Sequence, residues 1–378
     1  MCSSDLRDLD LYAKYHFKVV GWAGPPKATD PETLRKYRER LIDNYRDLKE
    51  HEAFLGYFLA DEPAWNGMPI ANLEAAYRII REFDPYHPVW INEAPRGEIG
   101  LIAEYGKFCD IFGVDIYPVP PPHPHSGLKN KELSCVGDYA ARMRSSVDGR
   151  KPVWMTLQGF AWNAHRNLPD PVYPTREQLR FMVFDSLVNG AQAVGFWGGR
   201  SIDNADFYRN LGETADELYR LSACLLAPES PEFKPASSNP GVGILARAVG
   251  GTHVIVAVNR TGAEQTFELT PECSGTFSAD GNSRSGDRFT DRLPAYGVRV
   301  YRDGPLPAPA WPRPDAPEEA GCPMLGNRIV WRTQAKWLWG TAPRRDPARQ
   351  TFAFRKSFPV DGELEGAVLT IDGDDEYT

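Results

Sequence analysis

The most constraining feature of the sequence is a repeated alternation of short apolar runs with helical patterns, from residue 7 to about residue 228. Such alternation is typical of βα units, in which parallel strands form one sheet covered by helices. Six strands are predicted, in the segments FKVVGWAG, LGYFLA, HPVWINEA, IFGVDIYPVP, KPVWMTLQGFAW and AQAVGFWGG. Asp30 before Pro31 predicts the start of one helix, and Thr175 with Gln178 predicts a capping box at another.

Two architectures accommodate this pattern, and the loops after the strands distinguish them. No GxGxxG motif or phosphate loop follows any strand, as expected if the sheet is not an open, nucleotide-binding one. We therefore favour a (β/α)8 TIM barrel, which needs two strands more than are visible. We expect a barrel lacking its first strands, with residues 1–6 an artefactual leader, because the chain enters directly into a helical pattern.

Three further segments follow the partial barrel, which is expected at residues 7–228. The composition changes near residue 229, and alternating apolar strands predict a small antiparallel β-sandwich at residues 240–303. Residues 304–320 are rich in proline and are expected to form an extended linker. The β alternation returns in residues 321–378, which we interpret as the start of a second β domain.

Composition and charge exclude several classes of partner. The 378 residues are 42% hydrophobic and 25% charged, an ordinary globular composition. A formal net charge of −8 argues against a nucleic-acid partner, and no run of about 18 apolar residues predicts insertion into a membrane. The six cysteines show no CxxC or Cys/His spacing, so neither a disulfide framework nor a zinc site is expected, and no cofactor is implied.

The residues at the carboxyl ends of the predicted strands are the candidates for a functional site. In a βα barrel these ends meet in one cavity, where the reactive residues lie. Acids, amides and aromatic rings gather there, a combination typical of sites that bind and cleave carbohydrate. The candidates are Trp22, Asp61, Glu62, Glu93, Asp115, Tyr117, Gln158, Trp162, Trp197 and Arg200.

Several of these candidates also have a purely structural interpretation. Glu62 can be a charge at the end of a strand, and Asp115 can cap the turn before Tyr117. Glu93 can simply begin the next loop, and Trp197 can plug the end of the barrel. Both interpretations stay open at the level of the sequence.

One segment resembles a known family. YFLADEP resembles the fourth-strand motif of the clan-A TIM-barrel glycoside hydrolases, in which Asn-Glu-Pro supplies the acid/base. The resemblance covers residues 7–228 and implies hydrolysis of O-glycosidic bonds in an oligosaccharide or polysaccharide, with Glu62 as general acid/base. Asp61 stands where the family has Asn, and its charge would raise the pKa of Glu62.

The sequence departs from this family at Gln158, where the nucleophilic Glu of the seventh strand is expected. An amide cannot form the glycosyl ester. Asp115 or Glu93 can replace it, as nucleophile or as base for a water, or a group of the substrate can assist. The alternatives are a catalytically inactive barrel that binds glycans and a barrel enzyme of another chemistry, such as a lyase or isomerase.

The C-terminal segment carries a second resemblance. AKWLWG, ARQTFAFRKSFPV and AVLTIDGDDEYT resemble the jelly-roll accessory domain beside bacterial α-L-rhamnosidases, and the preceding β domain looks like the one that such hydrolases append. Both imply a carbohydrate partner and a bacterial-type enzyme. We expect an extracytoplasmic or secreted location, although no signal peptide is visible at this N-terminus.

Overall fold

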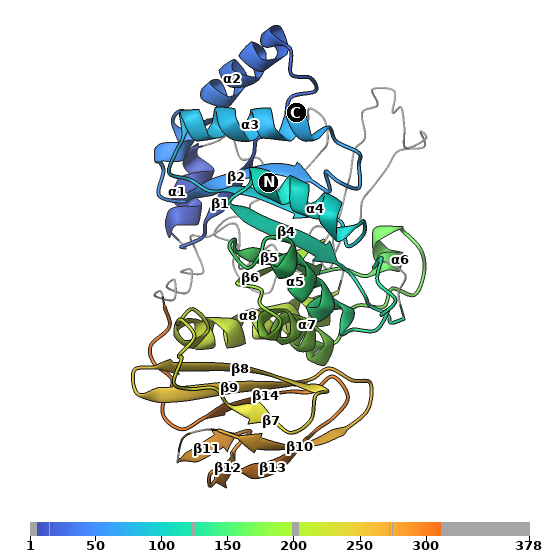
Figure 1. Cartoon of the computed structure of the whole chain (residues 1–378), viewed down its shortest axis with the longest axis vertical. Helices are drawn as coiled ribbons and strands as arrows, with labels where there is room; N and C mark the ends of the chain where they lie inside the picture. Colours follow the sequence, from blue (N-terminus) through green and yellow to red (C-terminus); the bar gives the residue numbers. More distant parts are fainter. Residues whose placement is uncertain are drawn as a thin grey trace, which may run out of the picture. The chain divides into compact units, whose positions relative to one another are not determined.

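The computed structural model describes residues 6–310, except residues 15, 123–125, 199–203, 272 and 274. Within this range a six-stranded parallel sheet with its helices is followed by antiparallel sheets of three and five strands (Figure 1). The predicted fold class, a partial TIM barrel followed by a β domain, is thereby confirmed. The predicted β domain at residues 321–378 and the site residue Arg200 lie outside the described residues.

The parallel sheet contains its strands in chain order, from β1 at one edge to β6 at the other. Successive strands in this order are what six consecutive strands of a TIM barrel show. The strands are β1 (Val19–Trp22), β2 (Phe54–Asp61), β3 (Val89–Glu93), β4 (Ile111–Ile116), β5 (Val153–Gln158) and β6 (Ala193–Trp197).

Helices connect these strands, and two predicted helix starts are confirmed. Asp30 caps its helix by accepting a hydrogen bond from the Thr33 amide at 3.0 Å. At the other, the Thr175 hydroxyl and the Gln178 side chain each accept from the other's backbone amide, at 3.2 and 3.0 Å. The helices are α1 (Leu6–Lys14), α2 (Pro31–Tyr45), α3 (Ile70–Phe83), α4 (Ile99–Tyr105), α5 (Cys135–Ser146), α6 (Trp162–His165), α7 (Arg176–Val188) and α8 (Ala205–Leu225), with 3₁₀ turns η1 (Leu48–Glu50) and η2 (Gly106–Phe108).

The two faces of the parallel sheet carry different side chains. The face toward the helices is apolar and at most 1% exposed, and includes Tyr57, Leu59, Val89, Ile91, Phe112, Val114, Ile116, Val153, Met155 and Leu157. On the other face the ring centroid of Trp90 lies 4.3 Å from that of Phe58 and 5.7 Å from that of Trp154. Gly113 leaves room for this aromatic layer, because a Cβ there would lie 2.4 Å from the Trp90 indole nitrogen.

Strand alternation places the polar strand ends on the face of this aromatic layer. Side chains two residues apart on a strand share a face, so Asn92 follows Trp90 and Asp115 follows Gly113. Asp61 is paired with Asn92 across β2 and β3, and Asp115 with Thr156 across β4 and β5. The carboxyl ends of three strands therefore direct acids and an amide into one region.

The β domain follows α8 and packs on the barrel helices. Its three-stranded sheet is ordered β13-β10-β7 and its five-stranded sheet β12-β11-β14-β9-β8. Val256 and Val258 belong to the same apolar core as the barrel residues, so the two parts share buried surface. The strands are β7 (Ala236–Ser237), β8 (Val242–Val249), β9 (Thr252–Asn259), β10 (Gln265–Thr270), β11 (Thr276–Ala279), β12 (Asn282–Ser285), β13 (Phe289–Leu293) and β14 (Val298–Arg302). No helix in the described part of the chain has the length and apolar character needed to cross a membrane.

Candidate active site

Glu62 occupies a strained turn at the carboxyl end of β2. Its φ angle is +47°, in the left-handed region that a residue with a Cβ rarely adopts. Its amide donates to the Asn92 carbonyl at 2.6 Å, which ties the turn to the neighbouring strand, and Pro63 follows. Such a conformation costs about 1–3 kcal/mol and is concentrated at functional sites in proteins. The strained turn thus holds the Glu62 carboxyl group at the end of the strand.

Asp115 lies against Glu62 from β4. Its side chain is 5% exposed and forms hydrogen bonds with the side chains of Glu62 and Tyr117. Burial, followed by the negative charges of Glu62 and Asp61, raises the pKa of Asp115 to about 8. Burial and the charge of Asp61 also raise the pKa of Glu62, against the opposing charge of Arg96. At neutral pH the two carboxyl groups in contact therefore hold a proton.

Asn92, on β3, connects the acids on β2 and β4 and also contacts Thr156 on β5. Its amide nitrogen donates to Asp61 at 3.1 Å and to Asp115 at 3.4 Å, and its amide oxygen accepts from the Thr156 hydroxyl at 3.2 Å. Asn92 stands at a predicted strand end beside Glu93, but the sequence assigns it no role in the site. Nothing in the sequence marks Thr156 or Arg96.

Glu93 lies beside this cluster but is 1% exposed. One carboxyl oxygen accepts from the Ala64 amide at 3.2 Å, and the other is buried without a hydrogen-bond partner among the residues that the structure describes. Burial raises the pKa of Glu93 to about 8, so it is mostly protonated at neutral pH. Its contact with Ala64 holds the turn that follows Glu62.

Aromatic side chains lie near the acids, at the carboxyl ends of β4, β5 and β6. The rings of Tyr117 and Trp197 stack with their centroids 5.7 Å apart, and the Trp162 indole donates to the Tyr117 carbonyl at 3.2 Å. Trp197 is 45% exposed, although its ring is large and apolar. Trp22 is equally exposed and lies on β1, where it packs edge-on against Phe58. Exposed rings beside acids offer stacking faces for an apolar side of a ligand.

Gln158 is fully buried and bonded to backbone. Its amide oxygen accepts from the Val119 amide at 2.8 Å, and its nitrogen donates to the carbonyls of Val119 and Phe160 at 2.9 and 3.0 Å. The amide nitrogen is therefore committed to two backbone segments, the loop that follows β4 and the one that follows β5. In this arrangement the side chain fixes the loop after β4 beside Asp115 and presents no donor to a bound molecule.

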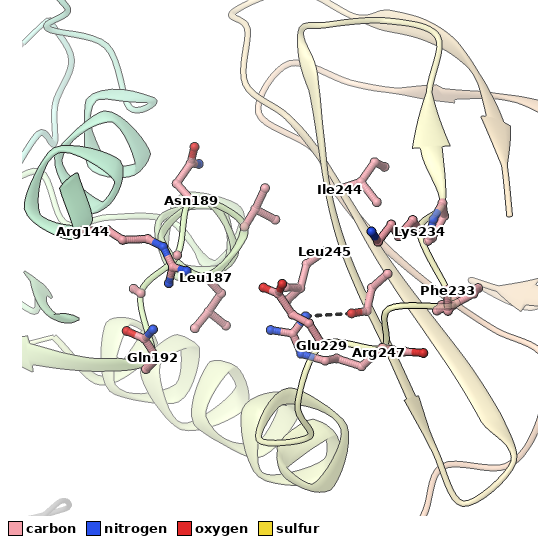
Figure 2. A pocket seen from close by; sticks show the side chains of 16 residues that line it. Arg144, Leu187, Asn189, Gln192, Glu229, Phe233, Lys234, Ile244, Leu245 and Arg247 are labelled. Carbon is pink, nitrogen blue, oxygen red and sulfur yellow. Dashed lines mark hydrogen bonds between the residues drawn. The ribbon is translucent and has the colours of Figure 1, made fainter. Parts of the chain in front are cut away.

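A cavity of about 470 Å³ lies elsewhere, between the barrel helices and β8 (Figure 2). Arg144 at the end of α5 and Gln192 just before β6 line one side, with Glu229, Lys234 and Arg247 among the residues across from them. Because Gln192 precedes its strand, this cavity lies toward the amino ends of the strands, away from Glu62. It is separate from the acidic site.

Comparison with known proteins identifies the fold. No family model and no curated protein matches this sequence. The structure of AmyP in complex with maltose is similar over 80% of this chain and 78% of that one, with a TM-score of 0.50 and 11% identity. A catalytic mutant of Gan42B, a GH42 β-galactosidase from G. stearothermophilus, is similar over 73% and 82%, with a TM-score of 0.50 and 8% identity. The fold is that of a TIM barrel. At these identities the likeness concerns the fold alone.

Proposed function

We propose that the chain is a glycoside hydrolase that cleaves O-glycosidic bonds of an oligosaccharide or polysaccharide, with Glu62 as general acid/base and Asp115 as its partner carboxyl. The observation that carries this proposal is the contact of these two groups at the carboxyl ends of the strands, with raised pKa values and a strained turn under Glu62. Perturbed carboxyl pairs of this kind are characteristic of acid/base sites. The TIM-barrel fold shared with a β-galactosidase supports it.

The proposed reaction uses the single proton that the pair holds at neutral pH. Glu62, the less buried of the two, donates it to the glycosidic oxygen as the bond to the anomeric carbon breaks. Asp115 acts on the opposite side, as nucleophile or as base for a water. Paired carboxyls in retaining glycosidases lie about 5–5.5 Å apart, so the Glu62 side chain rotates away from Asp115 as the sugar enters. Asn92 keeps Asp115 in place meanwhile.

Trp197, Tyr117 and Trp162 are proposed to bind the apolar face of the sugar. The two stacked rings and the neighbouring indole lie at the ends of the strands next to Asp115. Trp22 would bind a further sugar unit at the opposite edge of the sheet, where it is exposed. The proposed roles of Glu93 and Gln158 are to support the Glu62 turn and the β4 loop rather than to contact substrate.

The test is hydrolysis of a panel of aryl glycosides and plant and bacterial polysaccharides, measured as chromophore or reducing-end release by the full chain. Release that disappears in Asp115→Asn as well as in Glu62→Gln supports the proposed pair. Release that survives in both variants contradicts it.

A catalytically inactive glycan-binding protein is the second candidate, and Gln158 favours it, because its amide stands where the family has a nucleophile and is bonded to backbone. The contact of Asp115 with Glu62 favours the enzyme, since a binding protein gains nothing from two carboxyls that repel each other. Binding of glycans in affinity electrophoresis, unchanged by Glu62→Gln and with no hydrolysis of the same panel, would establish the second candidate.

The pH dependence of hydrolysis depends on Asp61. Burial, and in addition the charge of Asp61, raises the pKa values of both Glu62 and Asp115, that of Asp115 to about 8, so the pair retains its proton up to about that pH. We expect hydrolysis to fall as the pH rises through that value, because the acid is then ionised. Asp61→Asn removes the charge and is expected to move the alkaline limb of the kcat/KM profile to lower pH, by roughly 0.5–1 unit. If the alkaline limb stays at the same pH in Asp61→Asn, the charge of Asp61 does not control the pKa values of the pair.

A further inference from the structure

Three side chains with metal-binding atoms converge at one end of the β domain. His253 lies at the start of β9, Asp303 directly follows β14, and Cys273 follows β10 in the other sheet. One potential ligand atom from each lies within 4.8 Å of the others. Among the residues that the structure describes, this is the one group of three or more His, Cys, Asp or Glu side chains in such an arrangement. The acids around Glu62 do not form one.

The His253–Asp303 half of this group is already fixed in place. One Asp303 carboxyl oxygen accepts from the His253 backbone amide at 2.7 Å, and the other lies 2.7 Å from the His253 ring nitrogen Nδ1. The Phe233 ring covers the imidazole, with the two ring centroids 4.5 Å apart. The rotamers of both ligands are thus held before any ion arrives, which lowers the entropic cost of binding.

Cys273 completes the group from the second sheet. Its thiol is free and partly buried, and it packs at the margin of the apolar core of the β domain. Burial, followed by the negative charge of Asp303, raises the pKa of this thiol. A thiol that is protonated without metal becomes a strong ligand once a cation supplies the positive charge that stabilises its thiolate.

We propose that His253, Cys273 and Asp303 form a Zn²⁺ site that joins the two sheets of the β domain. Sulfur, imidazole nitrogen and carboxylate oxygen are the ligand types of Zn²⁺, whereas Ca²⁺ and Mg²⁺ take oxygen. Ligand atoms on one tetrahedral Zn²⁺ lie roughly 3.3–3.6 Å apart, so the ion enters between His253 Nδ1 and Asp303 with a small outward shift of both. The neutral imidazole then carries its one proton on Nε2. The Cys273 proton is released to solvent, and water fills the fourth position.

The experiment uses the full chain, stripped with EDTA and returned to ZnCl₂ at neutral pH. We expect one equivalent of zinc to be retained after gel filtration, and a rise in Tm on the order of 5 °C at saturating zinc. Substituting Co²⁺ should give the near-ultraviolet charge-transfer band of a thiolate ligand. Cys273→Ser and His253→Gln should each abolish the Tm rise, and Cys273→Ser should also abolish the band.

A matched control is His87 in the barrel, whose ring nitrogen Nδ1 lies 2.8 Å from the Asp84 carboxyl. Among the described residues, this His–Asp pair has no third side chain that could complete a metal site. His87→Ala should leave the zinc-induced rise in Tm intact. If His253→Gln fails to fold, Cys273→Ser alone decides the question, because serine preserves the size of the side chain. A zinc response of equal size in Cys273→Ser, or no retained zinc in the wild type, would overturn the proposal. The proposal is independent of any catalytic role of Glu62.

Discussion

Replacing Glu62 by glutamine is expected to lower glycosidase activity by about 10²- to 10⁴-fold, the usual contribution of a general acid/base. Glutamine keeps the shape of the side chain and cannot donate a proton to the glycosidic oxygen. The effect should fall mainly on kcat, because the proton transfer occurs in the transition state and contributes little to the binding of the ground state. Initial rates on the best substrate of the panel, with kcat and KM determined separately, measure this.

The same variant should not lose stability. Glu62 is partly buried, and its charge is repelled by Asp61 and lies against Asp115. Removing the charge relieves this repulsion, so the Tm of Glu62→Gln should equal or exceed that of the wild type. Loss of activity together with a lowered Tm would point to a structural role of Glu62 and would contradict our proposal.

Glu98→Gln is the matched control for this prediction. Glu98 lies in the loop after β3, as Glu62 lies after β2, but its side chain is exposed. The substitution removes the same charge from a neighbouring loop without touching the acidic cluster. Its activity should stay within twofold of the wild type. An equal loss in both variants would show that the general electrostatics of the barrel mouth, and not Glu62 itself, control the rate.

The strand ends could be predicted from the sequence because they follow uninterrupted apolar runs. IFGVDI is buried on both faces and LGYFLA is buried or half-buried, and such runs end where the chain reaches the rim of the sheet. The acids Asp61, Glu62 and Asp115 stand at those ends, and the structure brings them together. Helix caps such as Thr175 with Gln178 could be predicted equally well, because the two residues of the cap lie within one helical turn.

Contacts between distant segments could not be predicted in this way. Gln158 is bonded to Val119, 39 residues away, and no local pattern reveals that its amide is occupied by backbone. The left-handed conformation of Glu62 is equally hidden, since that region usually requires glycine or asparagine. The group of metal-binding side chains could not be predicted either, because metal motifs are recognised by short spacings in the sequence. Its members, His253, Cys273 and Asp303, come from separate segments in two sheets.

Arg260 carries the second large effect that we predict, and it concerns stability. It follows β9 in the β domain, and its guanidinium contacts the barrel through Asp185 at 2.7 Å and Asp138 at 2.8 Å. Asp185 is fully buried in α7, and its carboxyl also accepts from the Gly137 amide and the Asn189 side chain, at 2.9 and 3.0 Å. Arg260→Met leaves this buried carboxylate without its cation, at an expected cost of about 3–5 kcal/mol in the free energy of unfolding.

The loss in Arg260→Met should depend on pH, in a direction that Asp185 determines. Burial raises the pKa of Asp185 to about 6 even though Arg260 opposes the shift, so removing Arg260 raises it further. A carboxyl whose pKa is raised in the folded state favours folding when protonated, and this contribution is lost as the pH rises through the folded-state pKa. At pH 5 Asp185 is largely neutral in both proteins, whereas at pH 8 the variant must bury an unpaired charge or bind a proton.

Urea unfolding at the two pH values should therefore show the larger destabilisation at pH 8, and Arg260→Met combined with Asp185→Asn should recover most of the difference. A loss that is equal at both pH values would mean that Arg260 acts through packing rather than through its charge.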